Sequence, residues 1–226
     1  GCYNGLQLFK KVNGTWRFHK NVAGFSESSR FLLQENDTVF WISHGGKGIF
    51  RLKLSSDLDS VKSYRLYTSK NGLPSDEQNI LFQYNGKPYF STIEGIYEYV
   101  TESDSLIPAE KLNKTFNFDG RLKTVKSDTD GNIWFIADNE SGVLRLNDDL
   151  TFAKITTPFK QLDNRYVNEF EFIYPYNNDH VFIGIDNGFA HYSSKLSKLY
   201  SEPFQSFITK IEIPYLDSTL LLYNRE

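Results

Sequence analysis

A motif built around a glycine recurs along the chain at nearly constant spacing. It consists of a short apolar run, a polar insert rich in turn residues, a glycine and a second apolar run, as in GNIWFIADNESGVLRLN at 131–147. The glycines lie 43, 47, 47 and 46 residues apart, at Gly5, Gly48, Gly95, Gly142 and Gly188. Repeats of about 40 to 50 residues are typical of β-propellers, in which each repeat forms one four-stranded blade. The spacing therefore predicts an all-β propeller fold.

Turn residues and alternating apolar residues predict where the strands of each repeat lie. First strands are expected at SSRFLLQ, QNILFQY, RLKTVKS and EFEFIYP. The turns that follow them contain residues that tolerate positive φ, namely Asn36-Asp37, Asn85-Gly86, Asp130-Gly131 and Asn178-Asp179. Each second strand carries an aromatic residue that we expect at an equivalent buried position between blades. These aromatic residues are Phe40, Tyr89, Trp134 and Phe182.

Third strands are expected to begin at the glycines, as in GIFRLKL and GVLRLN, and more polar fourth strands follow, as in SVKSYRLYT and TFAKITTPF. This pattern predicts four complete four-stranded blades between residue 29 and about residue 204. GLQLFKKV and GTWRFHKN predict two strands of a partial blade, so we expect part of a larger propeller. PAEKLNKTF at 108–116 is too short for a stable isolated helix, and a fourth strand or its loop is expected there.

The composition supports this fold and argues against some partners. Aromatic residues make up 16% of the chain, with 19 Phe and 14 Tyr, and such residues favour strands. A net charge of -3 without a Lys/Arg stripe argues against direct nucleic-acid contact. No apolar run approaches the roughly 20 residues of a membrane span, so none is expected in this segment. The absence of methionine favours an origin within a longer polypeptide.

No group of residues has the spacing of a metal site, a cofactor site or a catalytic set. The four histidines lack metal-ligand spacing, and the single cysteine, Cys2, cannot form an internal disulfide. The stretch Asp128-Thr129-Asp130-Gly131 superficially matches a calcium loop but lies where a hairpin turn is expected. Acidic residues cluster at 57–59, 148–149 and 169–171, and most are expected to be solvated strand ends. We therefore predict no metal, no cofactor and no catalytic residue.

The loops between second and third strands are the predicted ligand-binding region, because propellers commonly bind ligands at loops on one end of the channel. Polar residues of these loops are His44, Lys47, Glu94, Asp138, Glu140, Asp186 and Asn187. The alternative for each of them is a solvated loop position without a ligand.

NGLPSDEQNILFQYNGKPYFSTIEGIYEY at 71–99 resembles the two-component regulator propeller repeat in the order and spacing of its parts. The shared parts are a Gly-Leu-Pro connector, a first strand, an Asn-Gly turn, an aromatic-led strand ending in Thr, and a glycine. The resemblance covers residues 5 to about 204, although the other connectors depart from the Gly-Leu-Pro form. The expected domains are a propeller at 1–205 and, at 206–226, the start of a triple-tyrosine immunoglobulin-like domain or closing strands.

The resemblance implies an extracytoplasmic sensor of a hybrid histidine kinase, or a propeller that precedes a helix-turn-helix, chiefly in Bacteroidetes. A glycan fragment and the other domains of the receptor are then the expected partners, and any kinase activity lies in domains outside this chain. The expected location is the periplasm, or the cytoplasm if the parent is a soluble helix-turn-helix regulator. The alternatives are a polysaccharide hydrolase or lyase and a purely structural interaction platform.

The last strand-like segments, ITKIEIP at 208–214 and STLLLYN at 218–224, allow two interpretations. Their order suits the first and second strands that the partial blade lacks, which would close a five-bladed ring. The resemblance favours the triple-tyrosine domain instead. On that interpretation the propeller is open, or its edge pairs with a second copy to give a homodimer.

Overall fold

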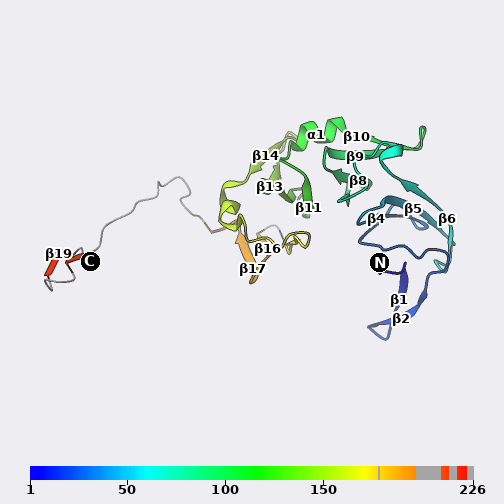
Figure 1. Cartoon of the computed structure of the whole chain (residues 1–226), viewed down its shortest axis with the longest axis horizontal. Helices are drawn as coiled ribbons and strands as arrows, with labels where there is room; N and C mark the ends of the chain where they lie inside the picture. Colours follow the sequence, from blue (N-terminus) through cyan, green and yellow to red (C-terminus); the bar gives the residue numbers. More distant parts are fainter. Residues whose placement is uncertain (178, 197–209, 214–217, 223–226) are drawn as a thin grey trace. The chain divides into compact units, whose positions relative to one another are not determined.

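The computed structural model describes residues 1–177, 179–196, 210–213 and 218–222. The chain divides into two compact units, Gly1–Lys195 and Leu196–Glu226. The first unit is mostly β and consists of antiparallel sheets that follow one another along the chain (Figure 1). Among the described residues, no helix has the length and apolar character needed to cross a membrane.

Four sheets form a propeller-like arrangement, as the sequence predicts. The first sheet contains β3 (Phe31–Gln34), β4 (Val39–His44), β5 (Gly48–Leu54) and β6 (Val61–Tyr67). The second contains β7 (Ile80–Tyr84), β8 (Lys87–Thr92), β9 (Gly95–Val100) and β10 (Ser105–Pro108). The third contains β11 (Leu122–Ser127), β12 (Ile133–Ala137), β13 (Ser141–Leu146) and β14 (Phe152–Ile155). The fourth contains β15 (Ile173–Pro175), β16 (His180–Ile185) and β17 (Gly188–Ser193).

The remaining elements of the first unit are short. The predicted partial blade is the two-stranded sheet of β1 (Gln7–Val12) and β2 (Thr15–Asn21). Two 3-10 turns, η1 (Ser69–Asn71) and η2 (Thr157–Leu162), follow β6 and β14. The fourth strand expected for the last blade, up to about residue 204, lies outside the described residues.

A close approach of two backbones explains the glycine that begins the third strand. Gly48 has φ of 101°, a left-handed conformation that residues with a side chain rarely adopt. A Cβ atom on Gly48 would lie 2.1 Å from the carbonyl oxygen of Tyr67, at the end of β6. The same approach occurs at Gly142, whose Cβ would lie 2.3 Å from the carbonyl oxygen of Ile155. The repeat therefore keeps glycine where the third strand meets the fourth.

Apolar cores lie between consecutive sheets. Trp41, Ile49 and Tyr67 of the first sheet pack with Phe90 and Tyr97 of the second. The core between the third and fourth sheets has Trp134 and Val143 on one side and Ile173, Val181 and Ile183 on the other. Each sheet thus buries its faces against its neighbours in the chain, which is how a propeller repeat is stabilised.

The predicted equivalence of Phe40 and Trp134 is wrong by one residue. Trp134 points toward the following sheet, and in the first sheet the residue that does so is Trp41. Phe40 instead packs partly buried against the preceding core, with Leu6 and Val22. Successive side chains of a strand point to opposite faces, so a shift of one residue moves the aromatic ring to the other face.

The side chains of the other two predicted aromatic residues, Tyr89 and Phe182, point to the same face of their sheets as that of Trp134. Tyr89 packs against the core shared with the third sheet, and Phe182 lies on the face of β16 opposite Val181 and Ile183. Trp134 is fully buried, whereas Tyr89 and Phe182 are partly buried.

The expectation of a strand or loop at 108–116 is also wrong, because residues 110–116 form the helix α1 (Glu110–Phe116). Leu112 and Phe116, one helical turn apart, are buried in the core between the second and third sheets. Figure 1 shows α1 between β10 and β14, and the ring of Phe116 contacts Phe152 of β14. Burial of one face thus stabilises a helix that its length alone would not.

A side chain of α1 takes the place of backbone pairing at the start of β9. Asn113 accepts a hydrogen bond from the backbone nitrogen of Ile96 and donates one to its carbonyl oxygen, both at 2.8 Å. Gly95 lies directly against it, since a Cβ there would be 2.9 Å from Asn113 Oδ1. In the first and third sheets this glycine faces a carbonyl oxygen of the fourth strand, so Asn113 replaces that strand locally.

In the second unit, β18 (Lys210–Ile213) pairs with β19 (Ser218–Leu222) as an antiparallel hairpin in a sheet of its own. The two segments that the sequence singles out are therefore partners of each other. Whether residues 206–226 begin a triple-tyrosine domain or supply closing strands stays a prediction.

Candidate functional site

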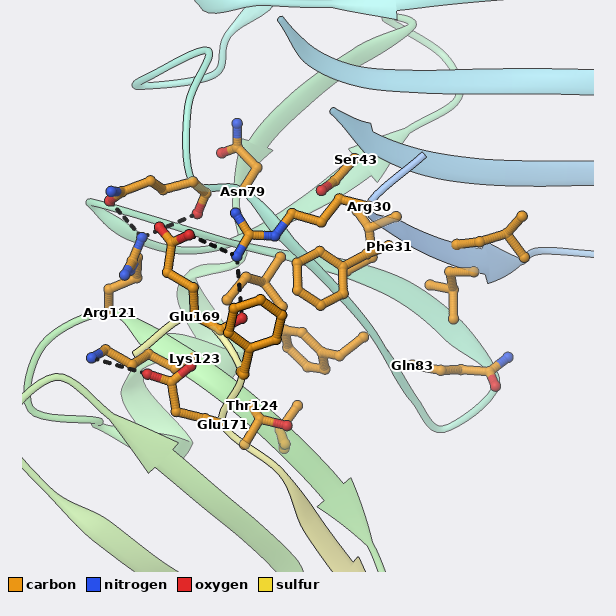
Figure 2. Close-up of a pocket in the computed structure, with 18 of the residues that line it drawn as sticks. Arg30, Phe31, Ser43, Asn79, Gln83, Arg121, Lys123, Thr124, Glu169 and Glu171 are labelled. Atoms are coloured by element: carbon orange, nitrogen blue, oxygen red, sulfur yellow. Dashed lines mark hydrogen bonds and ion pairs between the residues drawn. The ribbon is translucent and has the colours of Figure 1, made fainter. Parts of the chain in front are cut away.

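The first strands of the blades line a cavity of about 530 Å³ (Figure 2). Strands β3, β7, β11 and β15 contact one another in sequence, so their side chains face a shared space. The cavity is lined by residues 30–33 around β3, 43–45 around the end of β4, 78–83 around β7, 121 and 123–127 around β11, and 169–171 before β15. Its volume falls within the usual range of small-molecule pockets.

An ion pair connects the first and fourth sheets at this cavity. Arg30 Nη2 lies 3.1 Å from Glu169 Oε2 and also donates to the Glu169 carbonyl oxygen at 3.2 Å. The two residues are 139 positions apart in the sequence. Figure 2 shows Arg30 reaching across to Glu169, with Lys123 and Glu171 beside this pair. Both side chains of the pair are partly exposed, so the pair is accessible from the cavity.

Further charged side chains of the cavity are held by neighbours from other sheets. Lys123 Nζ lies 3.3 Å from Glu171 Oε1, and the Glu171 side chain is only 3% exposed. Arg121 Nη1 donates to Gln78 Oε1 at 2.6 Å. These contacts fix the positions of two cationic groups on the cavity wall.

Two buried polar atoms of the cavity wall, Ser43 Oγ and Asn79 Oδ1, have no hydrogen-bond partner among the described residues, and a third, Glu171 Oε1, has only its ion pair with Lys123. The counterpart of Ser43 in the next blade is Ser91, which donates to the carbonyl oxygen of Leu122 at 2.8 Å. Buried polar groups without partners are rare in folded proteins and require an explanation. Their occurrence in one cavity makes the cavity the candidate functional site.

Of the predicted ligand-binding residues, His44 lines the cavity. Its Nδ1 accepts a hydrogen bond from the Gly46 nitrogen at 3.0 Å, and its Nε2 lies 3.8 Å from Glu27 Oε2. Lys47 Nζ donates to the same carboxylate at 2.8 Å. This hydrogen bond is the main reason why the pKa of Glu27 is lowered.

Asp138 and Glu140 lie in the loop between β12 and β13. Asp138 Oδ2 accepts from the backbone nitrogen of Arg121 at 2.9 Å, and Oδ1 lies 3.6 Å from Lys123 Nζ. Asp138 thus contacts two cavity residues without lining the cavity. Glu140 accepts from the Asp119 nitrogen at 2.8 Å and pairs with Lys154, away from these groups.

The other predicted residues are not brought together with these. Asp186 and Asn187 both bind Arg165, whose Nη2 lies 3.3 Å from Asp186 Oδ1 and 2.6 Å from Asn187 Oδ1. Glu94 accepts a hydrogen bond from the Tyr97 hydroxyl at 3.4 Å. Most of the seven predicted residues therefore pair with residues from other segments of the chain, at separate places, and their role in ligand binding stays a prediction.

The sequence did not indicate the cavity residues from the first strands. The acidic cluster at 169–171 is conspicuous in the sequence, but the solvated strand end expected there is wrong for Glu171, whose side chain is buried. Burial of a carboxylate beside a cation could be inferred only once β11 and the segment before β15 were known to be neighbours.

The Asp128 stretch is a hairpin turn, as predicted. Asp128 Oδ1 accepts from the backbone nitrogens of Asp130 and Asn132, both at 3.0 Å. Its Oδ2 accepts from Asn132 Nδ2 and Trp134 Nε1, both at 2.9 Å. The carboxylate is thus occupied by the turn itself. In the part of the chain that the structure describes, no three His, Cys, Asp or Glu side chains are grouped to hold a metal ion.

No family model matches the sequence, and neither does any curated protein. Solved structures share the fold. The extracellular domain assigned to the hybrid two component system BT3049 from B. thetaiotaomicron aligns with a TM-score of 0.50 and 18% identity, over 85% of this chain and 24% of that chain. For the extracellular domain assigned to the hybrid two component system BT4673 of the same organism, the TM-score is 0.53 and the identity 17%, over 85% and 28%.

A second structure of the BT4673 extracellular domain, described as belonging to a one component system, gives a TM-score of 0.51 at 13% identity, over 85% of this chain and 30% of that chain. The chain thus resembles in fold the extracellular domains of Bacteroides hybrid two-component systems. It spans about a quarter to a third of the length of those chains.

Proposed function

We propose that the chain is a ligand-sensing propeller module of a signal-transduction regulator and that it acts in the periplasm. The observation that carries this proposal is the shared fold with extracellular domains assigned to two-component systems. A regulator of this kind places its output in other domains, so this module needs binding but no chemistry. If the parent were a soluble helix-turn-helix regulator, the module would act in the cytoplasm instead.

The ligand that we propose is an oligosaccharide fragment. The cavity supports this, because it is large enough for a sugar and its wall combines polar groups with the aromatic rings of Phe31 and Phe170. Signalling requires that the ligand binds one of two receptor conformations more tightly than the other. The loops that contain Asp138 and Asp186 would contact another domain of the receptor. That contact would change between the two conformations and so transmit ligand binding.

Binding rather than catalysis is favoured by the state of the cavity carboxylates. Glu169 is paired with Arg30, and Glu171 lies next to Lys123. Both carboxylates are thus held by cations of the cavity wall, an arrangement that suits the positioning of a ligand. The polysaccharide hydrolase or lyase remains the alternative that the experiment must address.

Incubation of the protein with mixed plant and host polysaccharide digests tests the proposal. Calorimetry and glycan-array binding should detect reversible binding, while a reducing-end assay should detect no product. Product release that is abolished by Glu169→Gln or Glu171→Gln would overturn the proposal in favour of the enzyme. Neither binding nor turnover would favour a structural platform.

A further inference from the structure

We infer that the cavity lined by β3, β7 and β11 binds a small anion that carries hydroxyl groups, such as a hydroxylated carboxylate. The inference rests on the proposed function in assuming that the chain binds a soluble ligand in this cavity, and it adds the charge and the polar groups of that ligand. Two independent properties of the cavity wall define the ligand: its charge and its unpartnered polar atoms.

The charge of the cavity wall favours an anion. Four cationic side chains line the cavity, namely Arg30, Arg121, Lys123 and Lys126, against the two carboxylates Glu169 and Glu171. Asp138 contacts Arg121 and Lys123 from outside the lining, and the cations still outnumber the carboxylates when it is included. This local excess contrasts with the net charge of -3 of the whole chain. A partly enclosed site concentrates such a field, so an anion is the complementary ligand.

The unpartnered atoms favour hydroxyl groups on that anion. Asn79 Oδ1 can only accept a hydrogen bond, so the ligand must supply a donor. Ser43 Oγ can donate or accept, and it lies on the wall of the same cavity. A simple anion such as sulfate offers no donors to these acceptors. A molecule with hydroxyl groups beside a carboxylate satisfies both requirements.

Arg30 is the group that would hold the carboxylate. Its partner Glu169 belongs to an irregular segment and has φ of 68°, in the left-handed region. The Arg30 and Glu169 side chains are 33% and 41% exposed, so the pair can exchange one carboxylate for another. A guanidinium binds a carboxylate through two parallel hydrogen bonds, and a ligand carboxylate in place of Glu169 would gain that geometry.

Calorimetry with three probes tests the inference: D-galacturonate, the neutral D-galactose, and inorganic sulfate. Galacturonate should bind at least about tenfold more tightly than galactose or sulfate, because it alone satisfies both the cations and the unpartnered acceptors. Equal affinity for galacturonate and galactose, or no binding of any of the three, would overturn the inference.

Two pairs of variants separate ligand binding from a structural role. Lys123→Gln should weaken galacturonate binding by about tenfold, and the control Lys62→Gln, on the exposed part of β6, should leave it unchanged. Ser43→Ala removes no hydrogen bond of the folded protein, so it should weaken galacturonate binding without lowering the melting temperature. Ser91→Ala removes the bond to Leu122 and should do the reverse. The opposite pattern in the serine pair would contradict the inference.

Glu169→Gln provides a test in the other direction, and it does not depend on whether Lys123→Gln folds. Removing this carboxylate frees Arg30 and raises the positive charge of the cavity, so galacturonate should bind several-fold more tightly. Weaker binding would overturn the inference. If oligosaccharides bind while galacturonate does not, the inference fails and the proposed sensor function stands. If galacturonate binds with the expected variant pattern while no oligosaccharide does, the site stands and the proposed glycan ligand fails.

Discussion

The indole nitrogen of Trp134 donates a hydrogen bond to Asp128 Oδ2, 2.9 Å away, from a side chain with no exposed surface. The first sheet repeats this relationship, since Trp41 Nε1 donates to Glu35 Oε2 at 2.7 Å. In both cases the carboxylate lies six residues before the tryptophan, in the turn that precedes its strand. The tryptophan thus links the interior between two sheets to the hairpin turn, and its polar atom is satisfied where it is buried.

Replacing Trp134 by alanine should lower the free energy of unfolding by roughly 3 to 5 kcal/mol, because it removes a fully buried aromatic ring from the core between the third and fourth sheets. Chemical denaturation followed by tryptophan fluorescence and circular dichroism measures the change. Trp16→Ala is the control, since Trp16 is 67% exposed on β2 and its removal should change stability by less than about 0.5 kcal/mol. Equal effects at the two positions would contradict the proposed packing.

Gly48→Ala should destabilise the protein by more than the roughly 1 to 2 kcal/mol of a left-handed residue, because its Cβ would also meet the Tyr67 carbonyl oxygen at 2.1 Å. The control is Gly45→Ala in the adjacent loop, where no atom lies within 4 Å of the added carbon. Thermal melting of both variants measures the difference. If Gly48→Ala had the melting temperature of the wild type, the third and fourth strands could move apart freely.

Asn113→Ala should cost about 1 to 3 kcal/mol, because the backbone nitrogen of Ile96 loses its partner at the buried start of β9 and the Ile96 carbonyl oxygen keeps only its bond from the Ala109 nitrogen. Lys111→Ala, on the exposed side of the same helix, controls for the change in helix propensity. Hydrogen exchange of the Ile96 amide gives a local readout. Unchanged protection of that amide in Asn113→Ala would refute the role of the side chain as a strand substitute.

Asp104 should make the protein less stable in acid. The Tyr67 hydroxyl donates to it at 2.5 Å, the Tyr99 hydroxyl at 3.0 Å, and Arg65 pairs with it, and these interactions, Tyr67 foremost, lower its pKa. A carboxylate with a lowered pKa contributes stability that is complete above its unfolded pKa of about 3.9 and is lost as the pH falls through the folded pKa.

The urea midpoint of the wild type should therefore fall more steeply below about pH 4 than that of Asp104→Asn. Asp37→Asn, in the exposed turn before β4, is the matched control and should keep the wild-type slope. If the urea midpoints of the wild type and Asp104→Asn fell with pH at the same slope, the tyrosine contacts would not lower the pKa of Asp104.

The order of the sheets could be predicted from the sequence because a glycine recurs at the start of each third strand, and at Gly48 and Gly142 the close approach of the fourth strand requires it. The position of a side chain within a strand could not be predicted by counting back from that glycine. Phe40 and Trp134 both lie eight residues before the glycine of their repeat. Because β5 begins at Gly48 whereas β13 begins at Ser141, one residue before Gly142, the same count selected Phe40 instead of Trp41.

The helix and the cavity could not be predicted from local patterns for a different reason. Helix α1 is stabilised by Leu112 and Phe116 in a core shared by two sheets, and the sequence of the helix does not contain that core. Arg30 and Glu169 come together from opposite ends of the first unit, with no periodicity that relates them. Such a site depends on the arrangement of the blades in space, and the spacing of the repeats does not determine that arrangement.

The cores between sheets also determine how the molecule opens. Strand β12 is buried at every position and contributes Phe135 to one core and Trp134 to the next, whereas β1 and β2 adjoin a single core and are largely exposed. Amide protons of β12 should exchange with solvent only when the whole unit unfolds, and those of β1 and β2 through local fraying. Protection should therefore be graded from the middle blades outward, and the earliest openings should leave the walls of the cavity in place.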